Sequence, residues 1–72
     1  MFLGISRREV KKLRGKGWNV YPYMLTKVQP LPFAKCVAFL ERGRVKRVLW
    51  SPANVPEKTR RVFLKELGDL NH

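Results

Sequence analysis

Residues 33–51, FAKCVAFLERGRVKRVLWS, constrain the fold of this chain more than any other segment. Two runs rich in β-branched and aromatic residues flank Arg42 and Gly43, and a two-residue connection containing glycine is typical of a tight β-hairpin. The sequence therefore predicts a hairpin that turns at these two residues. Its register follows from the turn and pairs Glu41 with Arg44, Leu40 with Val45, Val37 with Val48, and Lys35 with Trp50.

This register gives the hairpin two different faces, because successive side chains of a strand point to opposite sides. The first face is apolar except for one arginine and is expected to meet the core: Cys36, Ala38, Leu40, Val45, Arg47 and Leu49. The second is expected to be open and combines cations with aromatic rings: Lys35, Val37, Phe39, Glu41, Arg44, Lys46, Val48 and Trp50. Such a face can stack nucleic-acid bases. It can equally be covered by a protein partner or a second copy of the chain, because small domains seldom leave large apolar patches bare.

A first helix is predicted before the strands. Ser6, followed three residues later by Glu9, has the pattern of a capping box, in which the two residues satisfy each other's free amide groups. Val10 and Leu13 lie on one side of this helix and are expected to face the core. The helix is expected to end where glycine allows a positive φ, at Gly15 or Gly17.

A second helix is predicted after the hairpin, over residues 57–67, EKTRRVFLKEL. Asn54 is the expected cap, Pro56 suits the first turn, and Gly68 is expected to end the helix. Its apolar stripe consists of Phe63, Leu64 and Leu67.

The segment between the first helix and the hairpin predicts one strand and one connection. Residues 18–25, WNVYPYML, have strand composition, and Pro22 confines that strand to an edge or a bulge. Residues 26–32, TKVQPLP, are expected to form a connection because Pro30 and Pro32 lack the amide hydrogen of a ladder. The predicted fold class is α+β. It is one small basic domain over residues 1–72 with the order αβββα, in which a three-stranded antiparallel sheet carries both helices on one face.

Charge is the main indication of function. The chain has 16 Lys and Arg against 5 Asp and Glu, a formal net charge of +11. Nucleic acid is the commonest partner of so basic a domain, and we expect phosphate contacts with little sequence specificity. DNA and RNA, single-stranded or double-stranded, are all left open. The predicted nucleic-acid-binding residues are Arg7, Arg8, Lys11, Lys12, Arg14, Lys16, Lys35, Arg44, Lys46, Trp50, Lys58, Arg61 and Lys65.

The order αβββα resembles double-stranded RNA-binding domains and the HicA-type toxins that share their fold. The segments SRREVKKLRGKGW and VPEKTRRVFLKEL resemble the opening and the closing helix of HicA-type proteins. That resemblance implies a ribonuclease with a histidine in the second strand. The corresponding strand here reads FAKCVAFLE and has no histidine, so a toxin-like ribonuclease ranks behind two other functions: nucleic-acid binding, and a protein-binding regulator or inhibitor that uses the face of Phe39 and Trp50.

The remaining composition argues against catalysis and metal binding. Cys36 is the one cysteine and His72 the one histidine, which excludes an intramolecular disulfide and a multi-cysteine zinc site. No catalytic residue, metal or cofactor is therefore predicted, and the chain is not expected to be an enzyme. No apolar run approaches the length of a membrane span, so no membrane partner is expected and the cytoplasm is the expected location.

Overall fold

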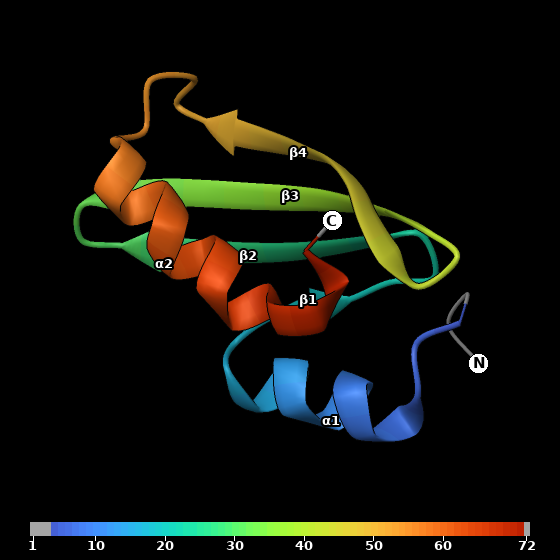
Figure 1. The fold of residues 1–72 in the computed structure, drawn as a ribbon. Coiled ribbons are helices and arrows are strands. Elements are labelled where there is room, and N and C mark those ends of the chain that lie inside the picture. Colours follow the sequence, from blue (N-terminus) through green and yellow to red (C-terminus); the bar gives the residue numbers. More distant parts are fainter. Residues whose placement is uncertain (1–3, 72) are drawn as a thin grey trace.

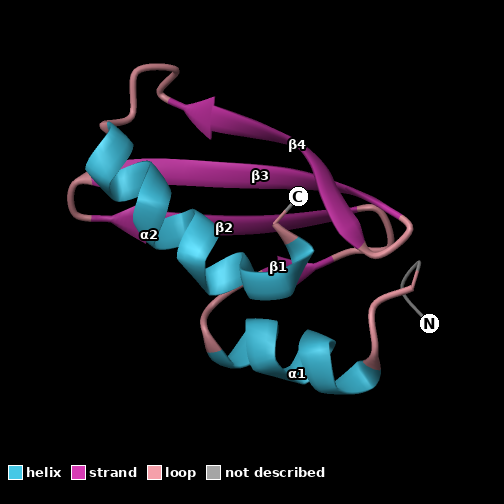
Figure 2. Cartoon of the chain, viewed as in Figure 1, coloured by secondary structure: helices cyan, strands magenta, loops and turns pink. Residues whose placement is uncertain are grey.

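The computed structural model describes residues 4–71, which form two helices and one four-stranded antiparallel sheet (Figure 1; Figure 2). The strands lie in the sheet in the order in which they follow along the chain, β1-β2-β3-β4. The elements are α1 (Arg7–Gly15), β1 (Asn19–Val20), β2 (Met24–Pro30), β3 (Phe33–Glu41), β4 (Arg44–Ser51), α2 (Glu57–Leu67) and the 3-10 helix η1 (Gly68–Leu70).

The expectation of three strands is wrong, because the sheet has a fourth. The segment expected as one strand is split at Pro22 into β1 and the start of β2, and the Tyr21 amide donates to the Met24 carbonyl across the turn at 2.9 Å. The segment expected as a connection is largely β2, which pairs with β3 from Met24 to Pro30. Prolines are tolerated in turns and at strand ends, and Pro30 and Pro32 occupy such places.

The hairpin turn is confirmed. Arg42 and Gly43 have φ values of 54° and 77°, and positive φ at both central residues is the mark of a type I′ hairpin turn. Next to the turn, Glu41 pairs with Arg44 and Leu40 with Val45, as expected.

Beyond these two pairs the expected register is wrong. The pairing shifts by one residue between Phe39 and Leu40, so Phe39 pairs with Arg47. Val37 consequently pairs with Leu49 instead of Val48, and Lys35 pairs with Ser51 instead of Trp50.

This bulge reverses the faces of β4, because one extra residue moves every later side chain to the opposite side. Leu49, expected in the core, is 48% exposed on the outer face. Trp50, expected on the open face, turns inward, and its ring centroid lies 5.7 Å from that of Phe63. Val48 also packs against the core.

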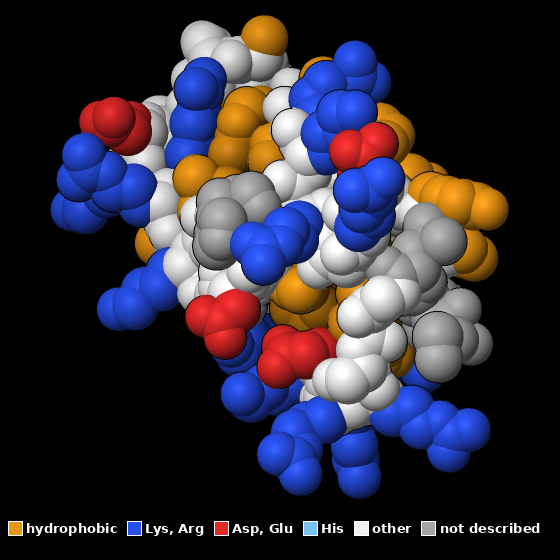
Figure 3. Space-filling view, turned by 45° about the vertical axis from the view of Figure 1, so that its right-hand side comes forward, with side chains coloured by type: hydrophobic (Ala, Val, Ile, Leu, Met, Phe, Trp, Pro, Cys, Tyr) orange, Lys and Arg blue, Asp and Glu red, His pale blue; other side chains and the backbone are white. Residues whose placement is uncertain are grey.

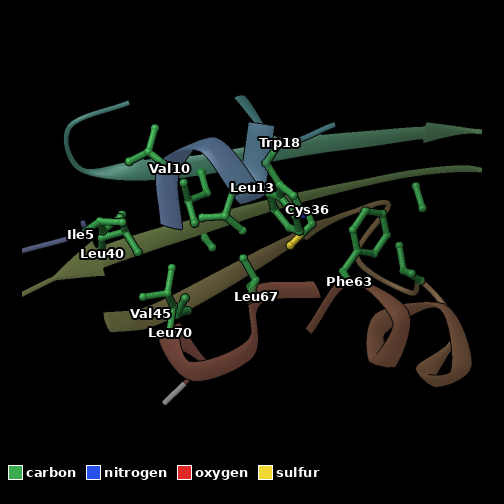
Figure 4. Close-up of a cluster of buried hydrophobic side chains, with 14 residues drawn as sticks. Ile5, Val10, Leu13, Trp18, Cys36, Leu40, Val45, Phe63, Leu67 and Leu70 are labelled. Atoms are coloured by element: carbon green, nitrogen blue, oxygen red, sulfur yellow. The ribbon is translucent and has the colours of Figure 1, made fainter. Parts of the chain in front are cut away.

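The core lies between the inner face of the sheet and both helices, which occupy the same side (Figure 1). Val10 and Leu13 reach it from α1, and Phe63 and Leu67 reach it from α2 (Figure 4). Trp18, only 2% exposed, meets Phe63 edge to face with centroids 6.0 Å apart. The small inward side chains of β3 leave room for these rings; they are Ala34, Cys36 and Ala38.

The helix ends are set by local contacts. The Glu9 amide donates to Ser6 Oγ at 3.1 Å, which confirms the predicted start of α1. The predicted cap of α2 at Asn54 is wrong, because the N-cap residue is Pro56, which makes no side-chain capping bond. The end of α2 at Gly68, with φ 55°, is confirmed.

Arg60 stabilises the loop before α2. Its guanidinium donates to the carbonyl oxygens of Val55 at 2.8 Å and Ala53 at 3.0 Å, and lies 5.6 Å from the centroid of the Trp50 ring. Arg60, one of the 16 basic residues, therefore has a structural role.

Glu66 joins α2 to the first half of the chain. Its Oε1 accepts from Trp18 Nε1 at 3.1 Å and from Lys27 Nζ at 2.7 Å, and Lys16 Nζ lies 3.4 Å from its backbone oxygen. The Lys27 and Glu66 side chains are only 20% and 26% exposed. This ion pair is therefore less screened than those on the surface.

Candidate nucleic-acid interface

The exposed side of α1 is almost entirely basic. Val10 and Leu13 face the core. Because each residue of an α-helix is rotated by about 100° from the one before it, the basic side chains of α1 spread over an arc of about half the helix circumference. We call this surface the α1 basic face, and it consists of Arg7, Arg8, Lys11, Lys12 and Arg14, all exposed. Figure 3 shows Lys and Arg side chains projecting along the lower edge of the molecule, where α1 lies in Figure 1.

Four of the five cations of the α1 basic face form no salt bridge within the described residues. The salt bridges Lys27–Glu66, Lys46–Glu41 and Arg61–Glu57 use cations of β2, β4 and α2. Among residues 4–71, no salt-bridge partner is found for Arg7, Arg8, Lys11 and Lys12. Four exposed cations therefore lie within two turns of helix, with Glu9 as the one acidic residue of α1.

The exposed basic residues of α2 form a second, weaker group. Lys58, Arg61 and Lys65 lie on its solvent side, as the sequence predicts. Arg61 forms a salt bridge with Glu57 at 3.2 Å, with both side chains about three-quarters exposed. Lys58 and Lys65 remain without a salt bridge inside the described chain.

A small acid-lined pocket of about 120 Å³ separates the two helices at the end where α1 stops and η1 begins. Three of the five acidic residues line it: Glu9, Glu66 and Asp69. Lys16, a predicted binding residue, lies here against α2. Lys12 and Lys16 line the same pocket, so the border between the helices carries charges of both signs and is not a continuation of the α1 basic face.

The other predicted binding residues lie away from α1. Lys35 is half-buried on the outer face of the sheet, Arg44 is at the hairpin, and Lys46 forms a salt bridge with Glu41 at 3.1 Å. Trp50 is the clear correction, because it packs in the core beside Phe63 and is not part of an open stacking surface.

Arg47 was placed in the core by the sequence pattern and is exposed instead. Its guanidinium lies 4.9 Å from the centroid of the Phe39 ring, since the bulge brings the two residues opposite each other. No sequence signal specifies this pair, because it depends on the shift in register.

Groups for chemistry are scarce in the described chain. Burial raises the pKa of the Cys36 thiol from 9.0 to about 12, so the thiol is protonated near neutral pH and is a poor nucleophile. Residues 4–71 contain no group of three His, Cys, Asp or Glu side chains that could hold a metal ion. Within the same range, no helix is long and apolar enough to cross a membrane. His72 lies outside the described residues.

No family model, curated protein or solved structure matches the chain. The comparisons thus neither support nor refute the resemblance to HicA-type toxins and double-stranded RNA-binding domains.

Proposed function

We propose that the chain binds nucleic acid through phosphate contacts from the α1 basic face. The observation that carries this proposal is a group of four exposed α1 cations without a salt bridge inside residues 4–71, on a chain of net charge +11; they are Arg7, Arg8, Lys11 and Lys12. Arg7 to Arg14 spans about 10 Å along the helix at about 1.5 Å per residue. A duplex carries one phosphate charge per ~1.7 Å of its axis, so this length meets several phosphates at once.

The composition of the α1 basic face favours binding without sequence preference. Its exposed polar groups are cations, and no Asn or Gln, the side chains that read adenine, lies on α1. Contacts to phosphate position a protein on nucleic acid but carry no sequence information. We therefore expect similar affinity for unrelated sequences, with Lys58 and Lys65 of α2 making secondary contacts.

The same surface favours a duplex over a single strand. Proteins that bind single strands stack bases on aromatic rings, and α1 has no aromatic residue. The exposed aromatic residues belong to strands and turns, and they include Tyr21, Tyr23 and Phe33. A duplex needs only charge on its phosphate backbone, which the α1 basic face provides.

The test is a panel of four labelled ligands of equal length: double-stranded and single-stranded DNA, and double-stranded and single-stranded RNA. We expect fluorescence anisotropy to show binding of both duplexes at low salt, with dissociation constants tighter than the range of about 1–100 µM usual for non-specific complexes at physiological salt. The single strands should bind more weakly. Absence of binding to all four ligands would remove the proposal, and binding of single strands alone would move the site to the exposed aromatic residues.

We infer that the chain binds nucleic acid without cleaving it and is not a ribonuclease. General acid and base catalysis uses side chains that titrate near neutral pH, and histidine is the one that does so unperturbed. Within residues 4–71 there is no histidine. The RNA ligands of the panel should therefore be recovered intact.

We also propose a cytoplasmic location, because a free cysteine and a nucleic-acid ligand both suit that compartment.

A further inference from the structure

The outer face of the sheet, opposite the helices, carries apolar side chains that no described element covers. The register brings them together on neighbouring strands: Met24, Val28, Phe33, Val37, Phe39 and Leu49. We call this surface the outer sheet face. Val28, Phe33 and Leu49 are 46%, 56% and 48% exposed. Monomeric soluble proteins rarely expose an apolar patch that extends across several strands.

The outer sheet face is poorly suited to nucleic acid. The Arg47 guanidinium lies over the Phe39 ring, so this ring is not free to stack a base. Most of the other members of the face are aliphatic. Lys35 and Arg47 lie among its apolar rows, and Arg44 and Lys46 lie at its hairpin end, where Lys46 forms a salt bridge with Glu41. The chemistry of this face is that of a contact between proteins.

We propose that a second copy of the chain packs on the outer sheet face, sheet against sheet. Two antiparallel sheets pack well face to face, with their inner side chains interdigitated about 10 Å apart. β3 is nine residues long and lies between β2 and β4, so the face of these three strands measures about 30 by 14 Å, or roughly 430 Å², at about 3.3 Å per residue and 4.8 Å per strand. Two such faces together provide roughly 860 Å², the size of a weak and reversible interface.

The residues of this face suit a twofold contact, in which the same patch must be complementary to itself. Its middle row, Thr26, Val37 and Leu49, is uncharged and can meet its own copy. Lys35 and Arg47 lie in the rows on either side, where their aliphatic stems can cover apolar surface while the charged ends reach water. A 72-residue chain with a small core also gains from burying more apolar area.

The dimer would have four layers, helices–sheet–sheet–helices, with an α1 basic face on each outer side. If the proposed nucleic-acid binding holds, one dimer joins two nucleic-acid segments, but self-association itself does not depend on that function. The two activities respond oppositely to salt. Screening relieves the repulsion between two chains of charge +11 and strengthens the dimer, whereas salt weakens phosphate binding.

The experiment is sedimentation equilibrium of the nuclease-treated protein, free of nucleic acid, in about 0.1 M and about 1 M NaCl, where the screening length falls from about 10 Å to about 3 Å. We expect a monomer–dimer equilibrium that shifts toward dimer at high salt. Leu49→Asp, and separately Val28→Asp, should each weaken the dimer at least about tenfold, because each places a carboxylate in an apolar contact.

Val62→Asp is the matched control. Val62 is 51% exposed on α2, so the substitution changes the same charge at equal exposure on the other side of the molecule. It should leave the dimer unchanged, and circular dichroism should show all three variants folded. A protein that stays monomeric at both salt concentrations would overturn the proposal. A dimer that is weakened by neither Leu49→Asp nor Val28→Asp would also overturn the proposal. Because no nucleic acid is present, neither result bears on the proposed binding function.

Discussion

Replacing Arg7, Arg8, Lys11 and Lys12 together by glutamine is expected to weaken duplex binding roughly 4,000-fold at about 0.1 M salt. Each phosphate contact that is lost removes nearly one power of ten at that salt concentration, through the counterions that binding releases. The four side chains are exposed and form no salt bridge with residues 4–71, so the fold should be unaffected. Fluorescence anisotropy with a labelled duplex measures the change, and circular dichroism checks the fold.

The control for this variant removes the same number of charges elsewhere. Glutamine replaces four cations at the hairpin and the outer sheet face, Lys35, Arg42, Lys46 and Arg47, and α1 is left intact. We expect this control to weaken binding by less than about tenfold, because distant exposed charges are largely screened. Equal losses in the two variants would mean that net charge, and not the α1 basic face, determines binding.

Glu66→Ala is expected to lower the free energy of unfolding by about 2 kcal/mol. The substitution removes the acceptor of the buried Trp18 N–H and the partner of the Lys27 ammonium group. A buried donor without an acceptor retains its full desolvation cost. For a domain of this size, the loss corresponds to a fall in Tm of about 8–16 °C, measurable by thermal denaturation.

Glu57→Ala provides the matched control within α2. The Glu57–Arg61 pair is about three-quarters exposed, and exposed pairs contribute only about 0–1 kcal/mol. If the two substitutions lowered Tm equally, the link between Glu66 and the first half of the chain would not stabilise the fold. Glu66→Gln should fall between the two, because the amide keeps an acceptor for Trp18 but loses the charge that pairs with Lys27.

The parts of the fold that were predicted from sequence are those with local signals. Ser6 begins α1, Gly68 ends α2, and the Arg42–Gly43 turn needs only the residues on either side of it. The bulge next to Phe39 has no such signal. An extra residue fits in either strand of a hairpin, and the choice depends on which side chains the helices can bury. The core favours the register that turns the Trp50 ring toward Phe63 and leaves Leu49 outside.

The fourth strand was missed for a related reason. The composition around Pro22 predicts one distorted strand, although a proline can equally mark the turn between two strands. Pro30 and Pro32 were taken to exclude a ladder, but they lie at its end and in the turn beyond it. Proline indicates where a strand is interrupted or ends, and the pairing partners decide whether the chain returns as a new strand.

In the candidate site, too, the features with local signals could be predicted and the contacts between distant residues could not. The α1 basic face could be predicted because all its members lie on one helix. The residues that limit the extent of the α1 basic face could not be predicted. Glu66 meets Trp18 across 48 positions of sequence, and the pocket that separates the helices combines Glu9 with Asp69. In the sequence, Arg60 is one more basic residue of α2. Only the fold shows that its guanidinium binds the loop before the helix.

The salt dependence of duplex affinity tests the central claim most directly. If the four cations without salt bridges on the α1 basic face each neutralise one phosphate, a plot of log Kd against log[NaCl] should have a slope of at least about 3.6, and the four-glutamine variant should lower the slope by about 3.6. The plot is obtained by anisotropy titrations of one labelled duplex over a series of NaCl concentrations. A wild-type slope below about 1, or the same slope for the wild type and the variant, would contradict phosphate binding by α1.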